Sequence, residues 1–441
     1  MPDPNFEVKK LEAKKFSKIK KFWHQQMQKF EKDFGTTLEV VSILIEYQCD
    51  NQPIFKKYIS QTPEEAKFKL AKEENQFIND IQSALGKELP RFYSSDMNST
   101  FGFRTEEQHV KDIALFRQNL IELPESIGDL KNAVKLNLAS NLLKTVPRSI
   151  GNLENLEKLN LAFNQLNILP NTISSMKNLK ELSLSGNNFT EFPECIMSLK
   201  KLQKLYLWKN NIEIMPEFWD FNKLVELDLR NSKLKHLPKN IGNSRALKRL
   251  MVNSSNLVDL PESLGELVSA EEISLADNKI VELPDSIGNL VNLKELIISG
   301  NKISEFPNSI SNLKNLKRFY AWQNYVTHLP ESFGKLTKLE RLNLVHNQLE
   351  SLPDSLGNLE NLKDLYLGDN KLTTLPESIG NLKNLERLYL GGNDFLSLPD
   401  SITKLNLKFL HLKMIETSRF SPKIKDWIHH LRENGSEISA A

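Results

Sequence analysis

Tyrosine, tryptophan and arginine side chains stand at spacings that would gather them on one binding surface. Tyr206 and Trp208 are two residues apart, and so are Tyr320 and Trp322. Because residues two apart on a strand project from the same side, each pair would present two aromatic rings together. These residue types are the ones most enriched at interface hot spots. The candidate contact residues are Tyr206, Trp208, Arg318, Tyr320, Trp322, Arg341, His346, Tyr366, Arg387 and Tyr389.

Residues that could make or break bonds are few. Cys49 has no histidine near it in the sequence, and Cys195 lies in a Pro-Glu-Cys-Ile turn, where a packing role is expected. His429 and His430 are adjacent, so one helical face cannot present both to a metal. The chain contains no GxxxxGK[ST], HExxH or GxSxG motif. We therefore predict a non-enzymatic protein with no cofactor, no metal and no small-molecule substrate.

A strict internal repeat defines the elements that must position the aromatic residues. Prolines recur every 23 residues, except for one step of 22 residues between Pro216 and Pro238. They stand at Pro124, Pro147, Pro170, Pro193, Pro216, Pro238, Pro261, Pro284, Pro307, Pro330, Pro353, Pro376 and Pro399. An asparagine precedes most of them by six residues. This regularity predicts stacked repeats rather than the two or three globular domains that 441 residues would otherwise imply.

A single repeat, such as Leu156-x-x-Leu159-x-Leu161-x-x-Asn164, predicts a short strand followed by a sharp turn. Leu159 and Leu161 would share one face, which only stacking can bury, with parallel strands about 4.8 Å apart. The asparagine carboxamide would satisfy backbone groups of its own coil and of the neighbouring coil. The Leu-Pro-Glu-Ser-Ile-Gly segment predicts a turn and a short helical piece outside. The expected fold class is an α/β solenoid with a parallel sheet on its concave side.

These motifs resemble the leucine-rich-repeat family, in its 23-residue LPxxIGxLxxLxxLxLxxNxL class, over residues 105–415. That class occurs in plant intracellular Ras-group-related proteins, in Ras-suppressor and Ras-scaffold proteins, and in prokaryotic repeat proteins. The resemblance implies a horseshoe of about 14 coils with short helical or 3-10 convex segments. It also implies that a protein partner binds the concave face, and it makes a small Ras-like GTPase one such partner.

Three coils depart from the asparagine pattern. Gln118, Ser232 and Ser255 stand where asparagine is expected. Gln118 belongs to an atypical starting coil, whereas the two serines are in consecutive coils just after the 22-residue step. We expect a local irregularity or a change of curvature across residues 216–257. The alternative is tolerated drift, in which serine and water replace the amide.

The C-terminal part of the concave face is the favoured contact site. Tyr366 and Tyr389 lie two and three coils past Tyr320, roughly 10–15 Å along the sheet. The arginines and the histidine listed above flank them, while acidic and basic residues alternate on this face as they do on solvated surfaces. We hypothesise that a folded partner docks across Tyr320, Trp322, Tyr366 and Tyr389, in a scaffolding or signalling role. The Tyr206 and Trp208 pair is a second candidate contact.

Two other functions stay open. Arginines and tyrosines could stack on a nucleic acid or another polyanion, although Glu272, Glu295 and Asp364 are interleaved with them and argue against it. The chain could also be an effector that is exported without a cleavable signal.

Composition indicates a soluble, cytoplasmic protein. The net charge of +2 implies no bulk attraction to nucleic acid or to an anionic membrane. Lysines interrupt the apolar residues near the N-terminus, and no stretch approaches the roughly 18 apolar residues of a membrane span. Only two cysteines are present, which favours a reducing compartment.

Both ends of the solenoid need caps, because the leucine core is open there. Within residues 416–441, a helix is expected to begin at Ser421-Pro422 and to stop at Gly435. Residues 1–104 lack the repeat and predict a mainly helical N-terminal module. We expect helices over residues 16–30 and from Thr62 to about Gly86, with a strand over residues 38–47. The first helix is basic, which favours a solvated structural cap or, alternatively, contact with a membrane surface or an acidic partner.

Overall fold

The computed structural model describes residues 47–49, 52–54, 70–92 and 101–439. The chain divides into two compact units, residues 1–69 and 70–441. In the first unit, β1 (Tyr47–Cys49) pairs antiparallel with β2 (Gln52–Ile54). The predicted basic helix over residues 16–30, the helix start at Thr62 and the predicted strand before Tyr47 lie outside the described residues.

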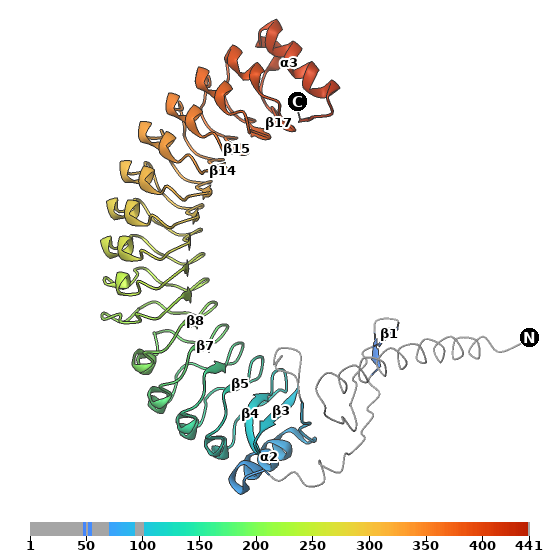
Figure 1. Ribbon diagram of the computed structural model, residues 1–441, viewed down its shortest axis with the longest axis vertical. Helices are drawn as coiled ribbons and strands as arrows, with labels where there is room; N and C mark the ends of the chain where they lie inside the picture. Colours follow the sequence, from blue (N-terminus) through green and yellow to red (C-terminus); the bar gives the residue numbers. More distant parts are fainter. Residues whose placement is uncertain (1–46, 50–51, 55–69, 93–100, 440–441) are drawn as a thin grey trace, which may run out of the picture. The chain divides into compact units, whose positions relative to one another are not determined.

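The second unit contains one sheet of sixteen strands, β3 to β18, which neighbour each other in chain order. The hairpin of β3 (Gly102–Glu106) and β4 (His109–Ala114) is antiparallel, and every later pairing is parallel. In Figure 1 the strands line the inner side of this unit and the short helices its outer side. The repeat strands are β5 (Lys135–Asn137), β6 (Lys158–Asn160), β7 (Glu181–Ser183), β8 (Lys204–Tyr206), β9 (Glu226–Asp228), β10 (Arg249–Met251), β11 (Glu272–Ser274), β12 (Glu295–Ile297), β13 (Arg318–Tyr320), β14 (Arg341–Asn343), β15 (Asp364–Tyr366), β16 (Arg387–Tyr389) and β17 (Phe409–His411). The parallel concave sheet predicted from the repeat is confirmed.

The strand leucines form the core. Leu159 and Leu161, for example, are 1% and 0% exposed, and their counterparts in the other coils join them in one continuous apolar cluster. Because the side chains alternate along each strand, the intervening residues project from the inner face. The core thus fixes which columns of residues remain on the inner face.

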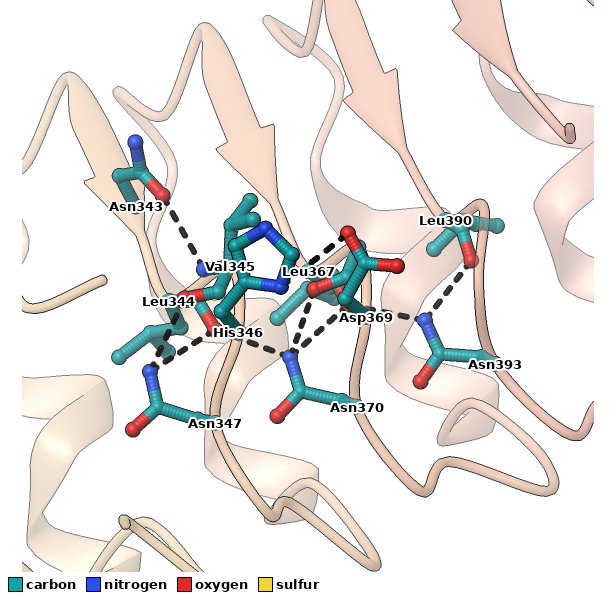
Figure 2. A network of polar contacts seen from close by, with 11 residues as sticks. Asn343, Leu344, Val345, His346, Asn347, Leu367, Asp369, Asn370, Leu390 and Asn393 are labelled. Carbon is teal, nitrogen blue, oxygen red and sulfur yellow. Dashed lines mark hydrogen bonds and ion pairs between the residues drawn. The ribbon is translucent and has the colours of Figure 1, made fainter. Parts of the chain in front are cut away.

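A ladder of buried asparagines closes the turn after each strand. The Asn370 carboxamide oxygen accepts the backbone N–H of Leu349 at 3.0 Å. Its amide nitrogen donates to the carbonyl of Leu344 in the preceding coil and to that of Leu367 in its own, at 2.9 and 3.0 Å. Asn347 and Asn393 bond in the same way (Figure 2). The amide therefore joins neighbouring coils, as expected.

Short 3-10 helices form the outer side, each beginning after a repeat proline. The glycine that many of these helices contain has a packing reason: a Cβ on Gly265 would lie 2.3 Å from the backbone oxygen of Ser286 in the next coil. They are η2 (Glu125–Asp129), η3 (Arg148–Asn152), η4 (Asn171–Ser175), η5 (Glu194–Ser198), η6 (Ile241–Asn243), η7 (Glu262–Glu266), η8 (Asp285–Asn289), η9 (Asn308–Asn312), η10 (Glu331–Lys335), η11 (Asp354–Asn358), η12 (Glu377–Asn381) and η13 (Asp400–Lys404), with η14 (Thr417–Arg419) after the last coil.

The coil with the 22-residue step is irregular, as predicted. Within the described residues 217–223 there is no 3-10 helix, and η6 in the next coil has only three residues. Trp219 fills the space, fully buried, and donates its indole N–H to the Ser244 hydroxyl at 2.8 Å. The Ser232 and Ser255 hydroxyls lie 2.8 Å apart and bond directly to each other.

Two helices lie at the ends of the second unit. α2 (Lys72–Leu85) ends at Gly86 with φ 62, as expected, and buries Phe77 and Ile81. It begins at Lys72 rather than continuing from Thr62, because Ala71 has an extended ψ of 143. Its Glu74 carboxylate accepts the N–H of Val110 at 3.0 Å and so joins the helix to β4.

The C-terminal helix α3 (Pro422–Glu433) begins as predicted. The Ser421 hydroxyl accepts the N–H of Ile424, and the Trp427 indole donates to the carbonyl of Leu405 at 3.0 Å. β18 (Glu437–Ser439) follows Gly435 and pairs with β17, which the sequence did not predict. Among the described residues, no helix is long and apolar enough to cross a membrane.

Candidate partner-binding face

Strand register places the predicted contact residues in columns on the inner face. Tyr320 ends β13, Tyr366 ends β15 and Tyr389 ends β16, all at the same position of the repeat. Each of these tyrosines is half-buried, and the apolar residues on either side of it are buried in the core. Trp322 stands two residues after Tyr320 and is also half-buried. The four residues therefore lie on one surface.

The structure brings the last aromatic residues into a continuous stack. The rings of Tyr366 and Tyr389 have centroids 4.4 Å apart and planes inclined by 27°. Phe409 stacks on the other side of Tyr389 at 4.7 Å, and the His411 ring lies 5.8 Å from it. Phe409 and His411 were not among the predicted contact residues, although the Leu410-x-Leu412 pattern aligns them with Arg387 and Tyr389. The stack runs across three strands, β15 to β17.

Two arginines bracket a buried carboxylate beside this stack. Asp364 is 3% exposed, and its two oxygens accept from Nε of Arg341 and Nη1 of Arg387, both at 2.8 Å. Nη1 of Arg341 also donates to the Tyr320 hydroxyl at 3.3 Å. The bonds to Tyr320 and Asp364 raise the pKa of Arg341, so it stays charged. Two guanidinium groups share one carboxylate, which leaves one cation in excess.

The expectation of solvated acidic residues on this face is wrong for three of them. Glu226, Asp228 and Asp364 are all less than 9% exposed. Each is held by arginine: Arg249 donates to Glu226 at 2.6 Å, and Arg230 forms a fork on Asp228 at 2.9 and 2.6 Å. A buried carboxylate needs such partners, because an unpaired charge away from water is costly.

The remaining predicted residues lie beside this group rather than in it. Arg318 donates to Glu295 at 2.5 Å, on the side toward the centre of the sheet. His346 faces Asp369 at 3.5 Å, at the turn where both residues have positive φ (Figure 2). We call the set Tyr320, Trp322, Arg341, Asp364, Tyr366, Arg387, Tyr389, Phe409 and His411 the C-terminal patch.

The tryptophans differ in whether the indole N–H has a hydrogen-bond acceptor within the protein. The indole N–H groups of the buried Trp219 and Trp427 both have protein acceptors. That of Trp322 has none among the described residues, and neither does that of Trp208. The hydroxyls of Tyr366 and Tyr389 likewise have no partner in the described part of the chain. These donors are free to bind a partner.

Tyr206 and Trp208 form a separate and smaller group. Trp208 packs edge-on against Phe163, with ring centroids 5.2 Å apart. Burial raises the pKa of Tyr206, and the nearby Glu226 charge adds to this effect. β8 is five strands from β13, about 24 Å along the sheet, so the structure does not join the two groups. Phe163 was not among the predicted contact residues; it has positive φ, which is unusual for a large apolar residue.

A shallow cavity of about 420 Å³ lies between the two groups, along the first residues of β8 to β13. Charged side chains of both signs line it, among them Lys204, Glu226, Arg249, Glu272 and Arg318. Val225 is its one uncharged lining residue. Such a wall offers polar contacts to a partner that crosses the middle of the sheet.

The residues considered for bond-making chemistry have structural surroundings. Cys195 lies half-buried in η5 against the core, where burial raises the pKa of its thiol to about 11. Its packing role is confirmed. His429 and His430 are exposed and contact Glu433 and Asn434. Within the described ranges no three histidine, cysteine or acidic side chains gather as metal ligands would.

Comparisons with known proteins agree with the fold. A model of a leucine-rich repeat region matches residues 272–367, and a model of two leucine-rich repeats matches residues 154–199, 177–218 and 360–413. A leucine-rich-repeat protein of Leptospira interrogans is 33% identical, with 73% of this chain and 81% of that chain covered and a TM-score of 0.57. A search of curated proteins found no match.

Two further solved structures are similar. The PEPR1–AtPEP1 crystal structure is 28% identical, with 83% of this chain and 55% of that chain covered and a TM-score of 0.68. An internalin of Listeria monocytogenes is 22% identical, with 77% and 95% covered and a TM-score of 0.58, a likeness of fold alone. The fold and these matches define a leucine-rich-repeat solenoid, a class of protein-interaction module. The chain belongs to the leucine-rich-repeat family.

Proposed function

We propose that this chain is a non-enzymatic scaffold that binds another protein on its concave face, chiefly at the C-terminal patch. One observation carries the proposal: the Trp322 indole N–H and the Tyr366 and Tyr389 hydroxyls have no acceptors in the described part of the chain, whereas the structural tryptophans do. Aromatic rings with unused polar tips provide large contact area at modest entropy cost.

The surroundings support the same proposal. Arg341 and Arg387 are held in place by Asp364, so little side-chain freedom is lost when a partner binds them. Arg318 and His346 flank the patch and would form its rim. Tyr206 and Trp208 provide a second, smaller contact for a partner long enough to reach β8.

Alanine substitution with affinity capture tests the proposal. The variant with Trp322→Ala and Tyr366→Ala is compared with wild type and with Tyr325→Ala, which removes an exposed tyrosine that is not part of the C-terminal patch. We expect at least tenfold lower recovery of specific partners by the double variant and no change with Tyr325→Ala, because hot-spot truncation costs about 2 kcal/mol or more. Unchanged recovery of every partner by the double variant would reject the patch.

Two further experiments test which protein is the partner and in which compartment this chain is located. The repeat class makes a small Ras-like GTPase the first folded protein to add in purified form, in its two nucleotide states. We propose a cytoplasmic location, since Cys195 is free and the chain has only one other cysteine. Cell fractionation checks this, and recovery of the chain from the culture medium would favour the exported effector instead.

A further inference from the structure

We infer that the C-terminal patch takes an acidic, extended polypeptide segment that carries an aromatic side chain beside its carboxylates. The inference rests on the proposed function and names the chemistry of the partner at that site. Three features lead to it: the charge balance of the arginines, the half-exposed aromatic stack, and the spacing of the strands that carry them.

The charge balance favours an acidic partner. Arg341 and Arg387 share the single carboxylate of Asp364, whose two oxygens are both used. The residues that directly precede these strands form a second row with the same imbalance. In that row Glu340 faces both Lys317, at 3.1 Å, and Lys363, at 3.5 Å. Each row therefore carries one cation more than its acidic partners neutralise. Since Asp364 already orients both guanidinium groups, an incoming carboxylate meets preorganised donors.

Beside Tyr366 the neighbouring column carries no side chain, whereas beside Tyr389 the His411 ring covers that column. The column next to Tyr366 and Tyr389 holds Gly368 and Gly391. A Cβ on Gly368 would meet only the Gly391 oxygen, at 3.2 Å, and a Val345 methyl, at 3.9 Å, whereas a Cβ on Gly391 would lie 2.6 Å from the His411 ring. The rings of Tyr366, Tyr389 and Phe409 are each only half-buried, so an aromatic side chain of the partner can pack against the stack, as aromatic pairs favour.

The spacing of the strands predicts how far apart the acidic residues of the partner segment are. Arg341 and Arg387 begin β14 and β16, two strand spacings apart, which is about 10 Å. Residues three apart in an extended chain are separated by roughly the same distance. A segment that crosses the strands would thus place two acidic residues three positions apart opposite the two arginines.

A polyanion fits this surface less well than an acidic peptide does. Nucleic acid needs a stripe of cations along which phosphates can follow one another. Here Glu295, Asp364 and Glu386 interrupt the basic residues in both rows. A peptide can place its two carboxylates opposite Arg341 and Arg387 and leave the residues between them uncharged.

The test uses the full chain and defined fluorescein-labelled probes, measured by fluorescence anisotropy. The acidic probe is Gly-Ser-Glu-Phe-Ala-Glu-Tyr-Gly-Ser, with its two glutamates three positions apart. The matched probes replace both glutamates with lysine, or both aromatic residues with serine, and a twelve-nucleotide oligothymidine probes polyanion binding. We expect the acidic aromatic probe to bind at least tenfold more tightly than each of the others, with affinity that falls as salt is raised.

Substitutions of single arginines test whether the acidic probe binds at the C-terminal patch. Arg387→Gln is expected to weaken the acidic probe at least fivefold, whereas Arg245→Gln, an exposed arginine away from the patch, should leave it unchanged. Arg387→Glu should bring the lysine probe to equal or tighter binding than the acidic one. Equal affinity for the acidic and lysine probes, or tighter binding of the oligothymidine, would overturn the inference. If partner capture still depends on Trp322 and Tyr366 in that case, the docking face stands and only its chemistry is wrong.

Discussion

Tyr366 stacks on Tyr389 with ring centroids 4.4 Å apart, and the two residues are direct partners in the register of β15 and β16. They occupy the same position of consecutive 23-residue coils, so the repeat turns a separation of 23 residues into ring contact. Residues that recur at an inner-face position in consecutive coils are placed side by side in the same way. The 23-residue period thus determines which side chains meet on the inner surface as well as in the core.

Tyr389→Ala interrupts this stack at its centre. Tyr389 contacts Tyr366, Phe409 and His411, so its removal should lower the free energy of unfolding by about 1 kcal/mol, the worth of such aromatic pairs. Urea unfolding followed by circular dichroism measures the loss. Tyr325→Ala is the matched control and should change stability by less than about 0.5 kcal/mol. Equal effects of the two variants would mean that the ring contacts add nothing.

Asn370→Ala tests the ladder that joins the coils. The substitution leaves the Leu349 N–H and the carbonyls of Leu344 and Leu367 without the carboxamide, all of them buried. We expect a loss of about 3 kcal/mol of unfolding free energy, since each unsatisfied buried group costs about 1–3 kcal/mol. The urea midpoint gives the value, and a loss below about 0.5 kcal/mol would show that the ladder is dispensable.

Gly265→Ala tests the close packing of the outer helices. The added Cβ would lie 2.3 Å from the Ser286 backbone oxygen, so the two coils must move apart, at a cost of about 1–3 kcal/mol. Gly368→Ala is the control, because its nearest neighbour would be 3.2 Å away and its φ is not positive. Melting temperatures of the two variants should differ clearly, with Gly368→Ala close to wild type.

The repeat period predicted the sheet, the asparagine ladder and the outer helices because these depend only on a strict spacing. The column positions of Tyr320, Trp322, Tyr366 and Tyr389 followed from the same rule. Their partners could not be predicted in this way. Whether Asp364 is buried between two arginines or solvated depends on side-chain packing across three strands, which alternation of charge along the sequence does not reveal.

The structure of coils that depart from the 23-residue repeat was harder to predict. Ser232 and Ser255 predicted an irregular coil, but Trp219 gave no signal that it would replace a 3-10 helix as a buried side chain. Phe409 and His411 were missed because the last coil is 22 residues from the one before, so the pattern had already weakened there. The Leu410-x-Leu412 pattern still gives the positions of Phe409 and His411, but the 23-residue period does not reach them.

Cys195 should react slowly with thiol reagents. Burial raises the pKa of its thiol from 9.0 to about 11, so the reactive thiolate is roughly a hundredfold scarcer near neutral pH. The iodoacetamide rate is measured at pH 8 in a Cys49→Ser background, with the urea-unfolded chain as the control. A native rate within fivefold of the unfolded rate would contradict the buried position.

Glu340→Gln tests the ion pairs beside the patch through their pH dependence. The hydrogen bond from Lys317 lowers the pKa of Glu340, and the charges of Lys317 and Lys363 add to the effect. A carboxylate with a lowered pKa in the folded state stabilises above its unfolded value of about 4.3, and the gain is lost as pH falls through the folded value. Wild type should therefore exceed Glu340→Gln in stability at pH 6, by less than about 1 kcal/mol because the pair is exposed, and the two should converge below pH 4. Urea unfolding of both proteins at pH 6 and pH 3.5 measures the difference. A gap that widens at low pH would show that Glu340 is stabilised as the neutral acid, contrary to its two lysine contacts.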